Sequence, residues 1–226
     1  MKILAIVAKW LFILCLPVLL LTASIGGAVN SLWLYKSGFE KYDVSQTTGL
    51  AESELEKAAT GLISYFNSDE EYISLAVMKD GEPFELFSQR EVIHLKDVKG
   101  LIRLDYRVLL GTLIYVLAYG AASLFRRDWR RLAWGIAGGS GLTLILVLAL
   151  GVGALLNFDQ LFLQFHLISF ANELWLLDPT KDYLIMLFPQ GFWYDAAIFC
   201  AGITAGLAVV LGGVSGGGLW TKRREV

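Results

Sequence analysis

Four long uncharged runs constrain the fold of this chain more than any other feature. They cover residues 10–35, 108–125, 132–158 and 196–221, and they are 26, 18, 27 and 26 residues long. A helix that crosses a bilayer needs about 20 largely apolar residues. Because backbone polar groups in lipid must be hydrogen-bonded within the protein, each run predicts a membrane-spanning α-helix. The hydrophobic content of 56% exceeds the roughly 45–50% of soluble domains and agrees with this prediction.

The first run has a second interpretation. Small residues at 22–24 could form the cleavage site of a signal peptide. The apolar cores of signal peptides are only about 7–15 residues long, so we expect this run to be a retained span.

Charged residues between the runs predict the orientation of the chain. Segments 1–9, 126–131 and 222–226 together carry nine basic and two acidic residues. Segment 36–107 carries nine basic and fourteen acidic residues, and segment 161–195 carries one basic and four acidic residues. Because basic residues collect on the cytoplasmic side, we expect both termini in the cytoplasm and the two larger segments outside. The net charge of −2 gives no indication of nucleic-acid binding.

The expected fold is an α-helical integral membrane protein, a four-transmembrane-helix bundle with a small α+β extracellular cap. Its expected parts are the first transmembrane helix at 1–35, the extracellular cap at 36–107, the second and third transmembrane helices with a basic cytoplasmic turn at 108–158, an extracellular interfacial aromatic segment at 159–195, and the fourth transmembrane helix with a basic cytoplasmic tail at 196–226. Glycine pairs spaced four apart at 135/139, 202/206 and 212/216 predict close helix packing.

Local patterns predict the elements of the cap. Apolar residues at helical spacing indicate an amphipathic helix over 48–66. Two β-prone runs flank Asp80-Gly81, which is typical of a hairpin turn. Ser88 followed three residues later by Glu91 is a capping box, so we expect a short helix from there to about Lys99.

The aromatic segment is too polar for a span and too apolar for an ordinary loop. His166 lies in it with phenylalanines four residues before and after, so these three rings should share one helical face. Asp178-Pro179 resembles the start of a helix, and Pro189 and Gly191 should break the chain before the last span. We expect two short re-entrant or interfacial helices joined by a turn.

Only the two histidines suggest chemistry. The chain has no GxSxG, HExxH, P-loop or CxxC motif, and its two cysteines, Cys15 and Cys200, fall far apart within spans, so no disulfide is predicted. His94 and His166 are the only histidines, and both lie in segments expected outside. Neutral imidazole can accept a proton near pH 7 and imidazolium can return one, so a pair can divide base, acid or oxyanion-stabilising roles.

Each histidine alone has a structural explanation. His94 can be an exposed histidine on a cap helix, paired with Glu91 or Asp97, and His166 can be an interfacial ring that covers apolar surface. Their shared location favours a common site. The candidate orienting carboxylates are Glu91, Asp97, Asp178 and Asp195. The candidate substrate-binding residues are Phe66, Asn67, Arg90, Phe165, Phe170, Trp175, Phe192 and Tyr194.

Three segments of the chain resemble a known family. They are FSQREVIHLKDVK at 87–99, Phe165-His166 with Phe170, Asn172 and Trp175, and Leu184-Ile185 with Leu187-Phe188-Pro189 and Phe192. Together with four spans and a small cap, this pattern is similar to the lipoprotein intramolecular transacylase (Lit) family of bacterial membrane proteins.

The resemblance implies an activity and a location. It implies an acyltransferase of the bacterial plasma membrane that moves the sn-2 acyl chain of an S-diacylglyceryl cysteine to the α-amino group of that cysteine. The product is the N-acyl S-monoacylglyceryl (lyso) form. The implied catalytic pair corresponds to His94 and His166 on the extracellular face, and the implied partners are diacylglyceryl-modified lipoproteins and membrane lipids. No metal and no soluble cofactor is implied.

Two other hypotheses remain at this point. A non-enzymatic membrane module could bind a lipid or a partner protein through its cap, with both histidines structural. A bis-histidine haem or metal protein is the third hypothesis, and the absence of further ligands next to either histidine in the sequence disfavours it.

Overall fold

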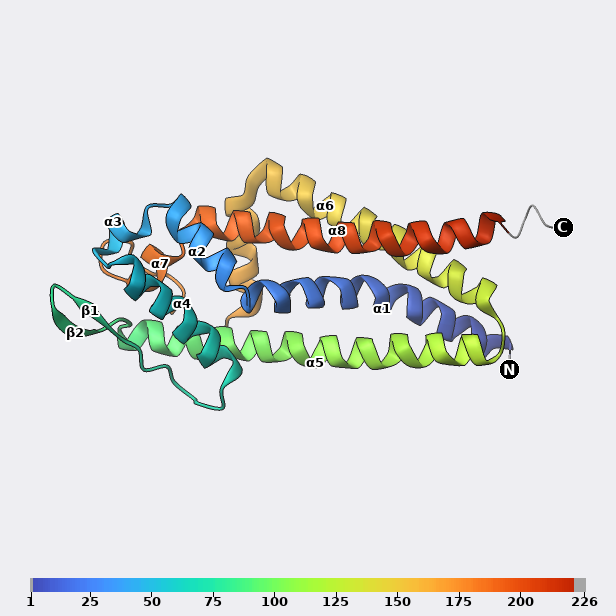
Figure 1. Cartoon of the computed structure of the whole chain (residues 1–226), viewed down its shortest axis with the longest axis horizontal. Helices are drawn as coiled ribbons and strands as arrows, with labels where there is room; N and C mark the ends of the chain where they lie inside the picture. Colours follow the sequence, from blue (N-terminus) through green and yellow to red (C-terminus); the bar gives the residue numbers. More distant parts are fainter. Residues whose placement is uncertain (1, 222–226) are drawn as a thin grey trace. The chain divides into compact units, whose positions relative to one another are not determined.

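The computed structural model describes residues 2–221 (Figure 1). The elements in chain order are α1 (Lys2–Val29), α2 (Leu32–Lys41), α3 (Val44–Thr48), α4 (Glu52–Asn67), β1 (Ala76–Lys79), β2 (Glu82–Glu85), α5 (Gln89–Phe125), α6 (Trp129–Ser169), α7 (Tyr183–Leu187) and α8 (Gln190–Thr221). The basic tail expected after the last span, residues 222–226, lies outside the described residues.

Within residues 2–221, four helices are long and apolar enough to cross a membrane. They cover Ile3–Val29, Gln89–Phe125, Trp129–Ser169 and Gln190–Gly216. This confirms the expected α-helical membrane fold with four spans and a small two-stranded sheet. Because a span needs about 20 residues, α5 and α6, with 37 and 41 residues, are longer than their membrane-spanning segments. We take those segments to be the uncharged runs of the helices.

The chain divides into two compact units. Unit 1 combines Met1–Gly26, Asp105–Leu155 and Ile198–Val226, and unit 2 combines Gly27–Leu104 and Leu156–Ala197. Unit 2 therefore joins most of the expected cap and most of the expected aromatic segment into one folded body.

Small residues permit close packing in unit 1. A Cβ on Gly139 would lie 2.8 Å from the Leu16 side chain, and a Cβ on Gly135 would lie 3.1 Å from Phe12. The glycine pair at 135/139 therefore packs against α1 as predicted. A Cβ on Gly202 or Gly206 would meet no described atom within 4 Å, so the described residues show no close packing at that pair.

The first span ends earlier than expected. Helix α1 stops at Val29, and Ser31 caps a new helix, α2, by accepting a hydrogen bond from the Leu34 backbone N–H at 3.4 Å. Asn30 and Ser31 carry no charge, so the uncharged run continued to residue 35 although the helix does not.

The small helices and the hairpin of unit 2 follow their turn residues. Gly49 has a φ of 71° and separates α3 from α4, so the amphipathic helix begins at Glu52 and not at residue 48. Asp80 and Gly81 both have positive φ, at 53° and 85°, between two antiparallel strands. Positive φ at both central residues is the type I′ geometry that matches strand twist, so the predicted hairpin is confirmed.

Helix α5 begins as predicted but does not end as predicted. The Ser88 N–H donates to the Glu91 carboxylate at 2.7 Å, and the Glu91 N–H donates weakly to the Ser88 hydroxyl at 3.4 Å. This reciprocal pair is the expected capping box. The helix then continues past Lys99 to Phe125. The residues that follow include no proline, and the isolated glycines at 100, 111 and 120 do not stop the helix.

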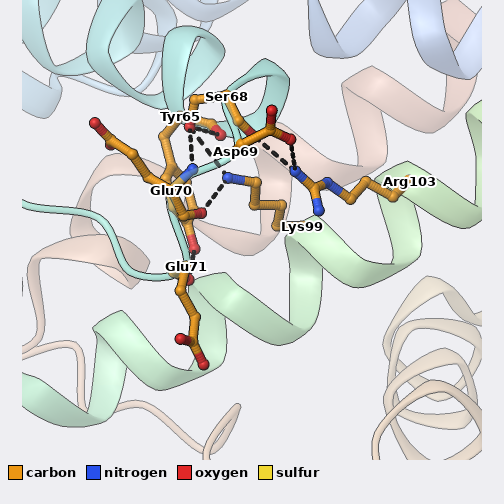
Figure 2. A network of polar contacts seen from close by, with 7 residues as sticks. All are labelled: Tyr65, Ser68, Asp69, Glu70, Glu71, Lys99 and Arg103. Carbon is orange, nitrogen blue, oxygen red and sulfur yellow. Dashed lines mark hydrogen bonds and ion pairs between the residues drawn. The ribbon is translucent and has the colours of Figure 1, made fainter.

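Two basic side chains of α5 hold the loop that follows α4 (Figure 2). The Lys99 ammonium donates to the Ser68 hydroxyl at 3.2 Å and to the Glu70 carbonyl at 2.6 Å, and it lies 4.0 Å from the Tyr65 ring centroid. The Arg103 guanidinium donates to the Ser68 carbonyl at 2.7 Å. These contacts fix the loop against the helix that carries His94.

The aromatic segment differs from the expected pair of interfacial helices. Helix α6 kinks at Asn157 (φ −161°, ψ 86°), whose side chain accepts a hydrogen bond from the Gln160 N–H and starts the last part of the helix. Asp178 begins a single turn and not a helix, and its carboxylate accepts hydrogen bonds from the Thr180 N–H and hydroxyl. The break before the last span is shorter than expected, because α8 starts directly after Pro189 and includes Gly191.

Candidate active site

The two histidines lie next to each other in unit 2. His94 is in the second turn of α5, and His166 is in the last part of α6, 72 positions later. Their ring centroids are 6.5 Å apart and their planes are inclined by 28°. Both side chains are buried, with exposed fractions of 6% and 9%. The fold thus brings together the only two histidines of the chain.

Aromatic rings surround the pair. The Phe170 ring lies 5.0 Å from the His94 ring and 5.6 Å from the His166 ring. Trp175 stacks at a tilt 4.9 Å from His166, and Phe165 meets His166 edge-on at 5.3 Å. Three of the candidate substrate-binding residues therefore contact the histidines. Such apolar surroundings disfavour the charged imidazolium.

Both histidines lie outside the uncharged runs that we take as the membrane-spanning segments. His94 precedes the uncharged run of α5 by 14 residues, and His166 follows the uncharged run of α6 by eight residues. Burial, reinforced by the neighbouring His166, lowers the pKa of His94 to about 4; Asp97 opposes this shift and Arg90 adds to it. Burial also lowers the pKa of His166, against a smaller raising effect of the Phe162 carbonyl. Both imidazoles are therefore neutral at pH 7.

Hydrogen bonding distinguishes the two neutral rings. His166 Nδ1 lies 2.7 Å from the Phe162 carbonyl oxygen. Since a carbonyl only accepts, Nδ1 carries the proton and Nε2 keeps a free lone pair. His94 Nδ1 is buried and has no hydrogen-bond partner within the described chain. An unpaired N–H at that buried position would cost free energy, so the proton of His94 is favoured on Nε2. The Phe162 carbonyl had no signal in the sequence, because a backbone oxygen is present at every residue.

The carboxylate of Glu91 has a structural role. It is 1% exposed and accepts hydrogen bonds from the Ser88 N–H at 2.7 Å and from the Leu184 N–H at 2.6 Å. These bonds join the start of α5 to the start of α7. Glu91 lies three residues before His94 on α5, but its carboxylate binds backbone N–H groups.

Arg90 and Asp97 contact the segment after α6. Arg90 donates to the backbone carbonyls of Glu173 at 2.7 Å and Leu174 at 3.3 Å. Asp97 accepts a hydrogen bond from the Asn172 amide at 2.9 Å. Both α5 residues therefore reach the stretch that contains Trp175.

Two of the predicted carboxylates have partners away from the histidines. Asp178 bonds to Thr180 and pairs with Lys181 at 3.4 Å. Asp195 accepts from the Lys41 ammonium at 2.6 Å and from the Tyr42 hydroxyl at 2.8 Å. The prediction that either one orients His166 finds no support in these contacts.

The remaining candidates lie further along the aromatic cluster or on α4. Phe192 is buried and packs 5.0 Å from Phe188, and Tyr194 meets Phe158 edge-on at 5.2 Å. Phe66 and Asn67 end α4. Phe66 packs 5.7 Å from Tyr65, and the Asn67 amide donates to the Asn30 side chain at 2.8 Å and to the Ile63 carbonyl at 2.8 Å.

The described residues contain no group of three or more His, Cys, Asp or Glu side chains that could hold a metal ion. The two imidazoles themselves can transfer protons and donate hydrogen bonds in an apolar setting.

Solved structures share this fold. The structure of the membrane integral lipoprotein intramolecular transacylase Lit from Bacillus cereus matches with a TM-score of 0.85 and 20% identity, over 99% of this chain and 100% of that chain. A variant of the same protein with one histidine replaced by arginine matches with a TM-score of 0.79 and 20% identity, over 100% of this chain and 96% of that chain.

Sequence comparison gives the family. A protein of Aquifex aeolicus (strain VF5), described as uncharacterized, is 30% identical over 145 residues; the match spans 62% of this chain and 62% of that relative, less than two thirds of its length. The family model for the lipoprotein intramolecular transacylase Lit matches residues 10–193, which is most of the chain. The chain therefore belongs to the lipoprotein intramolecular transacylase (Lit) family.

Proposed function

We propose that this protein transfers an acyl chain within bacterial lipoproteins. It moves the sn-2 acyl chain of the S-diacylglyceryl cysteine to the α-amino group of the same cysteine and leaves the N-acyl S-monoacylglyceryl (lyso) form. Membership of the family supports the reaction class. The observation that carries the site assignment is the proximity of the only two histidines, whose rings lie 6.5 Å apart among aromatic side chains.

The transfer needs one group that moves a proton and one that stabilises charge. The amine nitrogen attacks the ester carbonyl carbon, and a C–N bond forms while the carbonyl oxygen becomes an oxyanion. The nitrogen gives its proton to a base. The bond from carbon to the glyceryl oxygen then breaks, and this oxygen takes up the same proton. The products are an amide and a free hydroxyl, so no water, serine or cysteine nucleophile is required and the mass is unchanged.

The position of the proton on each imidazole ring decides which histidine takes which role. His166 has a free lone pair on Nε2, because its Nδ1 proton is bonded to the Phe162 carbonyl. We assign His166 as the base that receives the amine proton and returns it to the glyceryl oxygen. His94, neutral and with its proton favoured on Nε2, is the donor to the oxyanion.

Confinement of the substrate in the site lowers the activation barrier further. Amine and ester belong to one molecule, so the attack is already unimolecular, and a close-packed aromatic site would hold the two groups in the reacting geometry. Well-oriented systems gain about 7–11 kcal/mol of barrier reduction from such proximity. The acyl chain and the membrane-anchored substrate fit a site lined by Phe165, Phe170 and Trp175.

The proposal includes the location and the partners. By the charge distribution, both termini are cytoplasmic and the site faces outward across the bacterial plasma membrane. Its partners are diacylglyceryl-modified lipoproteins and membrane lipids, and no metal or cofactor takes part. A reporter that works only in the cytoplasm should be active when it is fused after residue 226. The acyl-transfer activity of the protein should be unchanged by metal chelators. Periplasmic or external reporter activity would contradict this topology.

Mass spectrometry of a lipoprotein's N-terminal lipopeptide tests the function. The host should lack other N-acylating activity, and the lipopeptide is compared with and without this protein. Conversion to an N-acylated lyso form at unchanged total mass is the expected result. A free amine on an intact diacylglyceryl cysteine, despite a folded protein in the membrane, would refute the transfer and favour a binding module.

Four histidine variants test the role assignment. His166→Ala and His166→Gln should both lose about 10²–10⁴-fold in rate, because neither side chain is a base. His94→Ala should lose about 10²–10³-fold as an oxyanion donor does. His94→Gln should lose less than His94→Ala, since its amide still donates. Glu56→Gln, in an exposed ion pair with Lys36 of unit 2, is the control for expression and folding. Equal losses for both His94 variants would contradict the donor role.

A further inference from the structure

A non-helical segment covers part of the histidine pair. We call residues 170–182 the strap; it connects α6 to α7 and contains no helix. Its first residue, Phe170, contacts both imidazoles, and its Trp175 ring lies 4.9 Å from His166. The position of the strap therefore sets the surroundings of both histidines.

Helix α5 holds the strap from both sides of His94. Arg90, four residues before His94, donates to two strap carbonyls, at Glu173 and Leu174. Asp97, three residues after His94, accepts from the Asn172 amide at 2.9 Å. Asn172 in turn accepts from the Leu174 N–H at 3.0 Å, so one side chain links α5 to the strap backbone beside Trp175.

We propose that Asp97 and Asn172 are positioning residues: their hydrogen bond places the strap so that Trp175 and Phe170 hold the two imidazoles in the arrangement that the acyl transfer needs. This inference rests on the proposed transacylase function. Neither residue is assigned a contact with the reacting atoms. Their effect passes through the aromatic rings that contact the histidines.

A small stability effect and a large rate effect should accompany the loss of this bond. The bond is exposed, and exposed polar pairs contribute little to global stability. A displacement of about 1 Å in an active site can nevertheless cost about 10²-fold in rate. A purely structural bond would instead change stability and leave the rate per folded molecule unchanged.

A reciprocal exchange separates positioning from a direct effect of the Asp97 charge. Asn172→Asp places two carboxylates opposite each other and should break the contact. Asp97→Asn removes the charge but keeps an oxygen that can accept from Asn172. The double variant Asp97→Asn/Asn172→Asp restores a carboxylate–amide bond with its direction reversed, and the new carboxylate can still accept from the Leu174 N–H.

The first measurement is the rate of lyso-form production by each membrane-embedded variant. Positioning predicts a loss on the order of tenfold to a hundredfold for Asn172→Asp, a much smaller loss for Asp97→Asn, and recovery in the double variant. The Glu56→Gln control should match the wild type. A large loss in Asp97→Asn that the double variant does not recover would overturn the proposal and indicate that the Asp97 carboxylate acts directly on His94 or on the substrate ammonium. Wild-type rates in Asn172→Asp would overturn it as well.

The second measurement does not depend on activity. Because the chain has only two histidines, protein labelled with ¹³C-histidine gives two ring Cε1–Hε1 signals, which His94→Gln and His166→Gln assign. The His166 signal should carry a ring-current shift from Trp175, lose it in Asn172→Asp and regain it in the double variant. An unchanged His166 signal in Asn172→Asp would refute the strap placement even if the rate fell. If the wild-type protein produced no lyso form, the proposed function would fail by itself, and these signals would still decide whether the pair positions the strap.

Discussion

Replacement of Glu91 tests how the site is anchored. One buried carboxylate accepts from the Ser88 N–H and the Leu184 N–H, at 2.7 and 2.6 Å. A hydrogen bond to a charged group contributes about 1.5–3 kcal/mol, so Glu91→Ala, which leaves both donors unpaired, should lower the free energy of unfolding by about 3–6 kcal/mol. Glu91→Gln keeps the volume and one accepting oxygen but turns an NH₂ group toward the other donor. It should therefore lose about half as much.

The assay is thermal unfolding of the full chain in detergent, followed by tryptophan fluorescence. For a domain of this size, 1 kcal/mol corresponds to about 2–4 °C, so Glu91→Ala should lower Tm by at least about 6 °C. Ser88→Ala is the matched control, because it removes only the 3.4 Å bond from the Glu91 N–H and a cap worth about 1 kcal/mol. A Glu91→Ala protein that unfolds within about 2 °C of the wild type would refute the reasoning, because two charge-assisted bonds could not then depend on this carboxylate.

Three further predictions concern burial and space in unit 2. The pKa of His94 is about 4 in the folded protein and 6.5 in a free side chain, so the free energy of unfolding is highest above pH 6.5 and falls by roughly 3 kcal/mol as the pH drops toward 4. When Tm is measured against pH, it should fall less steeply in His94→Gln than in the wild type. An identical slope would contradict the burial argument. A Cβ on Gly38 would lie 2.4 Å from the Phe192 ring, so Gly38→Ala should cost about 1–3 kcal/mol in thermal unfolding. A Cβ added to Gly100, inside α5, would meet no described atom within 4 Å, so Gly100→Ala should stabilise the protein by about 1 kcal/mol. A lowered Tm would show that the helix is not continuous there.

Features that depend on a few neighbouring residues were predictable. Asp80-Gly81 fixed a hairpin because positive φ is accessible to these residue types, and Ser88 with Glu91 fixed a helix start because their side chains reach each other's backbone N–H groups. The four spans were predictable for a similar reason, since an uncharged run of sufficient length has one favourable structure in lipid. The pairing of His94 and His166 needed more than local chemistry, and their shared side of the membrane and the family resemblance suggested it.

Features that depend on distant contacts were not predictable. Asp178-Pro179 has the residues of a helix start, but the Asp182 carboxylate accepts from the Asp178 N–H and closes a turn there. The end of α1 lies inside an uncharged run, so hydropathy could not show it. Asp195 shared the aromatic segment with His166, yet its partners are Lys41 and Tyr42, which lie more than 150 residues earlier in the chain.

The difference between the two histidines comes from the backbone around them. His166 lies four residues after Phe162 on a helix, so its Nδ1 reaches the carbonyl one turn back, which fixes the proton and frees Nε2. His94 Nδ1 is buried without such an acceptor, and a buried ring without a partner for its proton resists charging. A base must accept a proton during the reaction, so the ring whose imidazolium is supported by a carbonyl is the better base. Exchange of the two roles would require an acceptor beside His94 Nδ1, and the described neighbours of that nitrogen provide none.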